Sequence, residues 1–300
     1  MVSLVSPRAL ALGLAACAAV AAGCRGSDRP VRVGSKNFSE QVLLGEIVAQ
    51  TLETRGVRVD RRLNLGGTFV CHRALVAGEL DLYPEYTGTA FAAILAQKPV
   101  SDPAAVRAAV NREYATRWGL VWSPTLGFEN TFALVVRGQD ARRLGLTKIS
   151  DLAAHPDLRP GFGYEFLERE DGYKGLARAY GLSFQKRPAE MDLGLLYQAL
   201  ASGQVDVIAG NSTDGLIAAL GAVVLSDDRR YFPPYEAAFV VRGAIWRDHP
   251  AVSAGLTALA GAIDAPAMRR MNAAVDRDKR RPDEVAREFL LGLDKAGSHK

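Results

Sequence analysis

Apolar runs of strand length alternate with stretches of helical spacing through the first third of the chain. The run at residues 31–35 predicts a strand, and residues 40–55 predict a helix with Ser39 as its N-cap and Gly56 at its end. A second strand is expected at residues 57–63. These elements predict a strand–helix–strand unit at the start of the domain.

The same pattern continues into a second helix and a third strand. The helix carries Cys71, and the strand passes through Leu82 and is expected to stop at Pro84. Residues 87–89, Thr-Gly-Thr, then open an apolar helix over residues 90–96. Such a helix start presents free N–H groups to an anion. The β-α-β-α-β-α order predicts an α/β fold with a mostly parallel sheet and helices on both faces.

A second copy of this unit follows later in the chain. The sequence Ala-Leu-x-x-Gly-x-Leu-Asp-Leu at residues 74–82 recurs as Ala-Leu-x-x-Gly-x-Val-Asp-Val at residues 199–207. Upstream of the second copy, a strand, a helix and a strand are expected at residues 161–165, 172–180 and 182–187. A common helix-to-strand ending is the alternative explanation, but the order of elements also agrees. The repeat therefore predicts two lobes of similar construction.

Two segments are expected to connect the lobes. Residues 125–130 lie between apolar runs, and residues 233–236 lead back into a strand at residues 237–242. Two crossings and two sheets predict a hinged clam-shell with its ligand between the lobes, at the carboxyl ends of the strands. Asn211 would then occupy the place in the second copy that Tyr86 holds in the first. Lobe 1 is expected to comprise residues 31–126 plus 236–300, and lobe 2 residues 127–235.

The N-terminus has the pattern of a secretory signal peptide. Residues 1–23 contain one charged side chain, Arg8, before an apolar run that is too short to span a bilayer. The run ends in Ala-Ala-Gly-Cys, which resembles a bacterial lipobox, so we expect cleavage before Cys24 and lipidation of that cysteine. Residues 24–30 would form a tether. The pattern indicates an extracytoplasmic protein anchored to a membrane, with Cys71 as its remaining thiol and no internal disulfide.

Composition and chemistry argue against an enzyme or a nucleic-acid-binding protein. The 300 residues carry a formal charge of +4, and the basic side chains are scattered among acidic ones. The histidines are far apart, and no two have metal-ligand spacing. Cys71 lies among apolar neighbours, which indicates an inert buried thiol. Glu85, Glu165 and Glu168 could form a carboxylate pair, but nothing in the sequence separates their pKa values. We expect no catalytic residue, metal or cofactor.

Five ordered motifs resemble one protein family. They read Gly-Ser-Lys-Asn-Phe-Ser-Glu-Gln (34–41), Asp-Leu-Tyr-Pro-Glu-Tyr-Thr-Gly-Thr (81–89), Glu-Phe-x-x-Arg-x-Asp-Gly (165–172), Ser-Thr-Asp-Gly (212–215) and Tyr-Phe-Pro-Pro-Tyr (231–235). Together they resemble the substrate-binding proteins of ABC importers for osmoprotectants such as glycine betaine, choline and carnitine. The likeness extends over residues 31–291. It implies a two-lobed, periplasmic-binding-protein-like fold of type II with two crossover strands.

The resemblance also implies how the carboxylate of a betaine would be bound. The family's lysine of the first loop, threonine of the Tyr-Thr-Gly-Thr turn and arginine of the second lobe correspond to Lys36, Thr89 and Arg169. Charge-assisted hydrogen bonds from both lobes to one carboxylate would favour closure. A surface ion pair of Arg169 with Glu165 or Glu168 is the alternative.

The cage for the trimethylammonium group departs from the family pattern. Tight betaine binders are expected to have tyrosine at the positions that align with Tyr86, Leu126, Asn211 and Tyr235, and two of these lack the ring here. Losing two aromatic faces would weaken binding by about 1–4 kcal/mol. Asn211 could instead bind a polar part of a larger ligand. The nearby rings that could compensate are Tyr83, Phe128 and Tyr173.

The resemblance implies a receptor that delivers a small zwitterion to an ABC permease and its ATPase. We expect the protein to be a monomer. The alternatives are a different carboxylated solute, such as an amino-acid betaine or an amino acid, and a sensor lipoprotein without a transport partner.

Overall fold

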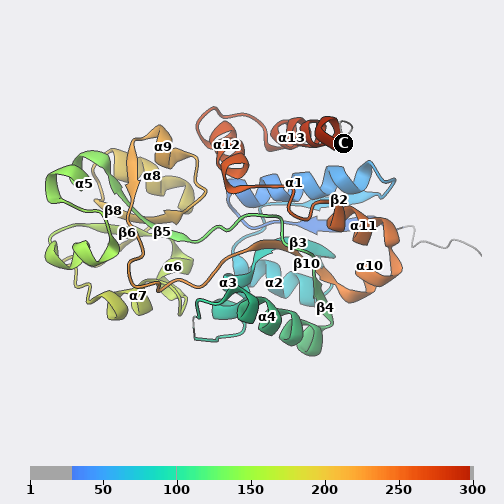
Figure 1. The fold of residues 1–300 in the computed structure, drawn as a ribbon, viewed down its shortest axis with the longest axis horizontal. Helices are drawn as coiled ribbons and strands as arrows, with labels where there is room; N and C mark the ends of the chain where they lie inside the picture. Colours follow the sequence, from blue (N-terminus) through green and yellow to red (C-terminus); the bar gives the residue numbers. More distant parts are fainter. Residues whose placement is uncertain (1–28, 99, 298–300) are drawn as a thin grey trace, which may run out of the picture.

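The structure is a computed structural model and describes residues 29–98 and 100–297. The predicted signal peptide and the predicted lipidated Cys24 lie outside the described residues. Two five-stranded sheets lie side by side, each flanked by helices, and two extended segments join them (Figure 1). We call the sheet that contains the first strand, with its helices, lobe 1, and the other lobe 2.

Lobe 1 is built from the beginning and the end of the described chain. The elements before the first crossing are β1 (Val31–Gly34), α1 (Ser39–Glu53), β2 (Val59–Arg62), α2 (Thr68–Val76), β3 (Leu82–Tyr86), α3 (Thr87–Thr89), a π-helical turn η1 (Ala90–Ile94), α4 (Pro103–Trp118) and β4 (Leu120–Trp122). Those after the return are β10 (Ala237–Arg242), α10 (Gly243–Asp248), α11 (Pro250–Ala258), α12 (Ala265–Asp276) and α13 (Pro282–Gly297).

Lobe 2 is built from the middle of the chain. Its elements are β5 (Phe132–Arg137), α5 (Gly138–Leu144), a 3-10 turn η2 (Ile149–Ala154), β6 (Pro160–Phe162), α6 (Tyr164–Glu168), α7 (Tyr173–Tyr180), β7 (Ala189–Glu190), α8 (Leu193–Ala201), β8 (Val207–Asn211), α9 (Leu216–Ala219) and β9 (Ala222–Val224).

The two sheets have equivalent strand orders, which confirms the predicted internal repeat. The orders are β2-β1-β3-β10-β4 and β7-β6-β8-β5-β9. In each sheet four strands run in the same direction, and the long strand that follows a crossing, β10 or β5, lies antiparallel between two of them. The sheets are therefore mixed: four strands follow the predicted parallel direction, and one strand of each sheet opposes it.

The repeated Asp-containing motif has the same structure in both lobes. Gly78 and Gly203 each end a helix with a positive φ, +74° and +73°. Asp81 then accepts hydrogen bonds from the main-chain N–H and guanidinium of Arg32, and Asp206 accepts the same set from Arg159. Each aspartate thus attaches the start of the third strand of its unit to the segment that begins the first.

The expected strand end at Pro84 is wrong, because β3 continues through this residue. Pro84 lies opposite Phe239 of β10. The N–H of Phe239 donates to Ser123 Oγ (3.0 Å), and its C=O accepts from the Ser123 N–H (2.9 Å), on the side away from β3. Because the N–H and C=O groups of Phe239 both bond Ser123, Phe239 needs no hydrogen bond from Pro84. The missing proline N–H therefore leaves no carbonyl unsatisfied.

Two further local predictions are wrong. Ser39 is the first residue of α1 rather than its cap, and its hydroxyl donates to Asp276 of α12. The strand expected at residues 182–187 is irregular chain, because the Leu182 and Gln185 N–H groups bond Ala177 and Pro156 instead of a neighbouring strand. The second strand of that unit is the two-residue β7, which begins at Ala189.

The two crossing segments, residues 123–131 and 226–236, pair with each other between the lobes. The Asn130 N–H donates to the Tyr235 carbonyl (3.1 Å), and an antiparallel bridge joins Glu129 to Glu236. Further along, the Leu126 N–H donates to the Ala237 carbonyl (2.8 Å). The predicted crossings are therefore a hydrogen-bonded pair, which limits how the lobes can move relative to each other.

The C-terminal helices pack on lobe 1. Helices α12 and α13 pack along α1 (Figure 1), and Asp264 caps α12 by accepting from the Ala267 N–H (2.7 Å). Helix α12 also reaches lobe 2, where a Cβ on Gly215 would lie 2.3 Å from the Ala273 nitrogen. Across residues 29–98 and 100–297, we find no helix with the length and apolar character needed to cross a membrane.

Gly88 is expected to be indispensable where β3 meets the second crossing. A Cβ there would lie 2.7 Å from both the Pro234 carbonyl oxygen and Tyr235 Cδ1. We expect Gly88→Ala to lower the free energy of unfolding by about 1–3 kcal/mol, because the main chain must shift. Gly194→Ala in α8, where a Cβ meets nothing within 4 Å, is the matched control. Urea unfolding of both variants tests this, and equal effects would contradict it.

Candidate functional site

A cavity of about 60 Å³ lies between the lobes. Lobe 1, both crossing segments and lobe 2 all contribute to its wall. Its lining residues are Lys36, Phe38, Thr68, Tyr86, Thr89, Asn130, Phe132, Glu165, Phe166, Arg169, Leu193, Ala209, Asn211 and Tyr235.

The structure brings most of the predicted site residues together in this wall. The six that line the cavity are Lys36, Tyr86, Thr89, Arg169, Asn211 and Tyr235. Leu126 does not line it. Its side chain is fully buried in the core, and its main chain bonds Ala237 and Ile263. As the repeat predicts, Tyr86 and Asn211 are the last residues of the equivalent strands β3 and β8.

Three phenylalanines add aromatic rings to the cavity lining. Phe132 lies directly opposite Asn211 in the β5–β8 pair, and its ring centroid is 5.9 Å from that of Tyr235. Phe166 packs edge-on against Phe132 at 4.8 Å, and Phe38 joins the wall from lobe 1. The compensating rings expected at Tyr83, Phe128 and Tyr173 are absent from this lining. Cross-strand register with Asn211 was the signal that could have indicated Phe132.

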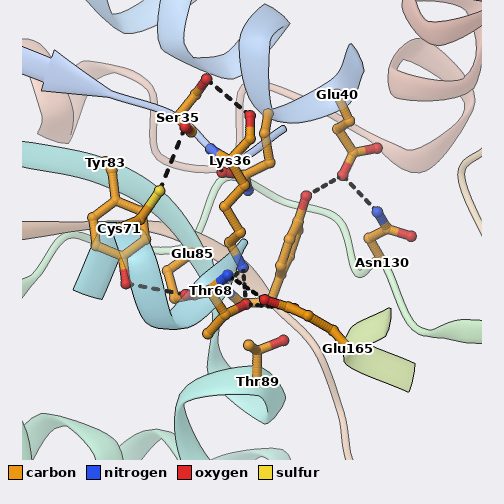
Figure 2. Close-up of polar contacts among 12 residues, drawn as sticks. Ser35, Lys36, Glu40, Thr68, Cys71, Tyr83, Glu85, Thr89, Asn130 and Glu165 are labelled. Atoms are coloured by element: carbon orange, nitrogen blue, oxygen red, sulfur yellow. Dashed lines mark hydrogen bonds and ion pairs between the residues drawn. The ribbon is translucent and has the colours of Figure 1, made fainter. Parts of the chain in front are cut away.

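Lys36 is held in the cavity wall by polar contacts on lobe 1 (Figure 2). Its ammonium donates to a carboxylate oxygen of Glu85 and to Thr68 Oγ1 (3.2 Å), and it lies 5.0 Å from the centroid of the Tyr86 ring. Glu85 also accepts from the Tyr83 hydroxyl (3.0 Å) and the Tyr86 N–H (2.8 Å). Lys36 is therefore a paired cation at cation–π distance from the Tyr86 ring.

Arg169 is the corresponding buried cation of lobe 2. Its Nε donates to Asp171 Oδ1 (2.8 Å) and its Nη2 to Asp171 Oδ2 (2.5 Å), while Nη2 also approaches Thr89 Oγ1 of lobe 1 (3.4 Å). The guanidinium lies 4.8 Å from the Phe132 ring centroid. Burial alone would lower the pKa of Arg169, but the charge of Asp171 and its hydrogen bonds raise it overall. The guanidinium thus stays charged, and the surface-pair alternative does not describe it.

Glu40 is a buried carboxylate near the cavity that the sequence analysis did not single out. Its buried carboxylate accepts four hydrogen bonds, from Tyr86 Oη (2.6 Å), Asn130 Nδ2 (2.8 Å), Thr213 Oγ1 (2.5 Å) and Asn272 Nδ2 (2.8 Å). These donors come from β3, the first crossing, lobe 2 and α12. Burial raises the pKa of Glu40, and the four hydrogen bonds oppose that rise. One carboxylate thereby ties the Tyr86 ring to both lobes.

Glu165 is a second carboxylate that connects the lobes. From α6 of lobe 2 it accepts from the Thr68 N–H (2.5 Å) and the Thr68 hydroxyl (3.0 Å) of lobe 1 (Figure 2). Its other near neighbour is Arg169 Nη1 at 3.8 Å. The expected partner Glu168 instead faces Lys174 at the surface.

Cys71 and His72 lie in the interior of lobe 1, outside the lining of this cavity. Burial raises the pKa of the Cys71 thiol to about 12 and lowers the pKa of His72 to about 4. The His72 ring packs edge-on against Trp118 and Tyr114, with centroids 4.5 and 5.4 Å away. Both side chains are packing residues, held in their neutral forms at pH 7.

The family of this protein follows from comparison with known proteins. Residues 29–291 match the family described as the substrate binding domain of the ABC-type glycine betaine transport system. The chain belongs to this family. As a member of it, the protein is a transport substrate-binding protein rather than an enzyme, and substrate-binding proteins of ABC importers work outside the cytoplasm.

Individual relatives cover nearly the whole of this substrate-binding protein. The carnitine transport binding protein OpuCC of Listeria monocytogenes is 33% identical over 283 residues, 93% of this chain and 91% of that protein. The ergothioneine transport permease/ergothioneine binding protein EgtU of Helicobacter pylori is 36% identical over 270 residues, 89% of this chain and 48% of that protein. A crystal structure of a glycine betaine/carnitine/choline ABC transporter has a TM-score of 0.73 at 32% identity, covering 87% of this chain and 98% of that one.

Glu40→Gln is expected to damage the site through Tyr86 and the lobe contact. The amide would present N–H groups to two of the four donors that now face a carboxylate, at a cost of about 2–4 kcal/mol. We expect a lower melting temperature and ligand binding that is weaker by at least ten-fold. Glu53→Gln, on the exposed end of the same helix, is the control and should change neither by much. Similar effects of the two variants would contradict the assigned role.

Asp214 is expected to make the stability of the protein depend on pH. It accepts from the Asn211 N–H (2.8 Å) and the Tyr197 hydroxyl (2.7 Å), and burial raises its pKa from 3.8 to about 7. A raised pKa means that its contribution to stability is fully present below pH 3.8 and is lost as pH rises toward 7. Asp214→Asn should remove roughly 1–3 kcal/mol of this dependence. Urea unfolding between pH 4 and 8 measures it, and parallel pH profiles of wild type and variant would contradict the assignment.

Proposed function

We propose that this protein captures a small quaternary ammonium zwitterion between its lobes and delivers it to an ABC permease. The observation that carries the proposal is the cavity itself, in which aromatic rings from both lobes and the crossings lie beside the guanidinium of Arg169. A trimethylammonium group has no N–H to donate, so aromatic faces are its best partners, each contributing about 0.5–2 kcal/mol.

The carboxylate of such a ligand has donors from both lobes within reach. Arg169 of lobe 2 already approaches Thr89 of lobe 1, and Lys36 lies on the same wall. A carboxylate that bonds Arg169 and Thr89 together interacts with the closed state more strongly than with an open one. By linkage, that difference in affinity is what drives the closure.

An amino-acid betaine larger than glycine betaine is the second candidate. Asn130 Oδ1 is buried in the wall and has no hydrogen-bond partner among the described residues, so a ligand with an N–H group would satisfy it. A neighbouring cavity of about 240 Å³ shares Phe38, Leu193 and Asn211 with the central one and offers room for a side chain. The ergothioneine-binding relative EgtU supports this class of ligand.

We propose further that the mature protein is a monomer held on the membrane through lipidated Cys24, with residues 24–30 as the tether. The Ala-Ala-Gly-Cys sequence after an apolar run supports the anchor. The ABC permease and its ATPase are the proposed partners, supported by the family to which the chain belongs.

A panel of ligands tests the proposed function. Isothermal titration calorimetry with glycine betaine, carnitine, choline and amino-acid betaines is expected to show saturable one-to-one binding of at least one quaternary ammonium compound, with a dissociation constant in the micromolar range or weaker. Tyr86→Ala should weaken it by about three- to thirty-fold. Binding of another solute class with no quaternary ammonium binding at all would contradict the proposal.

Arg169→Ala separates the two ends of the ligand. Carboxylated ligands are expected to lose about a hundred-fold in affinity or more, whereas choline, which has no carboxylate, should lose far less. Because the substitution leaves Asp171 unpaired, the melting temperature and the Arg169→Lys variant serve as controls for folding. Equal losses for carnitine and choline would remove Arg169 from the carboxylate site.

A further inference from the structure

Glu165 occupies the position in the cleft where an incoming carboxylate would find its donors. Its two oxygens are bonded to the N–H and the hydroxyl of Thr68, and the Thr68 hydroxyl in turn accepts from Lys36 Nζ (3.2 Å). Arg169 Nη1 lies 3.8 Å from the same carboxylate. Lys36, Thr68 and Arg169 therefore surround a carboxylate that belongs to the protein itself.

The main chain of lobe 1 is shaped to admit this side chain. Thr68 is the first residue of α2, whose free N–H groups favour an anion. The preceding Gly67 leaves space, since a Cβ there would lie 2.1 Å from Glu165 Oε1. The Thr68 N–H and hydroxyl, with the space at Gly67, thus form a fitted site for the Glu165 carboxylate, which we call its seat. The hydrogen bonds in this seat are charge-assisted.

The charges around the cavity leave Glu165 without a cation of its own. Lys36 is paired with Glu85, and Arg169 is paired with Asp171 through two hydrogen bonds. Among the carboxylates that face these cations, the Glu165 side chain is the exposed one, at 27% compared with 0% for Glu85 and Asp171. Glu165 can leave its seat without leaving a buried cation unpaired. If Glu85 or Asp171 moved away, Lys36 or Arg169 would remain buried without its partner.

We propose that Glu165 acts as a built-in counter-ion that sets the ligand preference of the site. A purely cationic ligand such as choline binds while Glu165 stays in its seat. The negative charge of Glu165 then balances the positive charge of the ligand. A zwitterion such as glycine betaine adds its own carboxylate to the one that Glu165 already places in the site. The ligand carboxylate must then displace Glu165 or be repelled by it at close range. This inference rests on the proposed function, because it presupposes a quaternary ammonium ligand.

Glu165→Gln tests the proposal. Glutamine keeps the shape and can still accept from the Thr68 N–H, but it removes the charge. We expect choline to bind more weakly and glycine betaine or carnitine more tightly, so that the ratio of the choline to the betaine dissociation constant rises at least ten-fold. Glu168→Gln, on the same helix with a solvent-exposed side chain beside Lys174, should leave the ratio unchanged.

Gly67→Ala provides a second variant that keeps every charge. Its added Cβ blocks the seat, while the φ of −78° at Gly67 is one that alanine adopts readily. The same ratio should rise, by less than in Glu165→Gln. Calorimetric titration of both variants with choline and glycine betaine measures it.

The outcomes separate this proposal from the one on which it rests. If wild type binds quaternary ammonium compounds but both ligands change equally in Glu165→Gln, Glu165 is a contact between lobes and the counter-ion role is wrong. If wild type binds no quaternary ammonium compound, the proposed function fails first and the counter-ion role fails with it.

Discussion

The closed arrangement of this protein depends on one buried carboxylate, that of Glu40. A carboxylate without partners is strongly disfavoured in a protein interior, and Glu40 finds its four donors only when β3, the first crossing, lobe 2 and α12 all converge on it. Opening the lobes would remove Thr213 from this set and expose the others to water. The position of the Tyr86 ring and the closure of the lobes are thereby linked through a single group.

The duplicated fold explains why a ligand site forms at this place. Strands β3 and β8 are equivalent in the two sheets, and each ends at the cleft, with Tyr86 and Asn211 as the final residues. The paired crossing segments hold these two ends near each other and contribute Asn130 and Tyr235 from the hinge. The two lobes share one architecture but differ in chemistry, because the Tyr86 ring at the end of β3 corresponds to the Asn211 amide at the end of β8.

Much of this arrangement could be predicted from sequence, because the repeat and the ordered motifs are local patterns. The equivalence of Tyr86 and Asn211 needed only the shared spacing after Asp81 and Asp206. What sequence could not show depends on contacts between distant segments. Phe132 enters the site through strand register, Asp171 through its pairing with Arg169, and Pro84 stays within β3 because Phe239 bonds elsewhere. Leu126 has the aligned position but a different direction, into the core.

The most direct test of the account is a crystal structure of the wild-type protein grown with a saturating quaternary ammonium compound. We expect the ligand to be enclosed between the lobes, with its nitrogen within about 6 Å of the Tyr86 or Tyr235 ring centroid. Any ligand carboxylate should bond Arg169. A ligand bound in a surface groove of one lobe, or lobes that close around a cavity from which the ligand is absent, would contradict it.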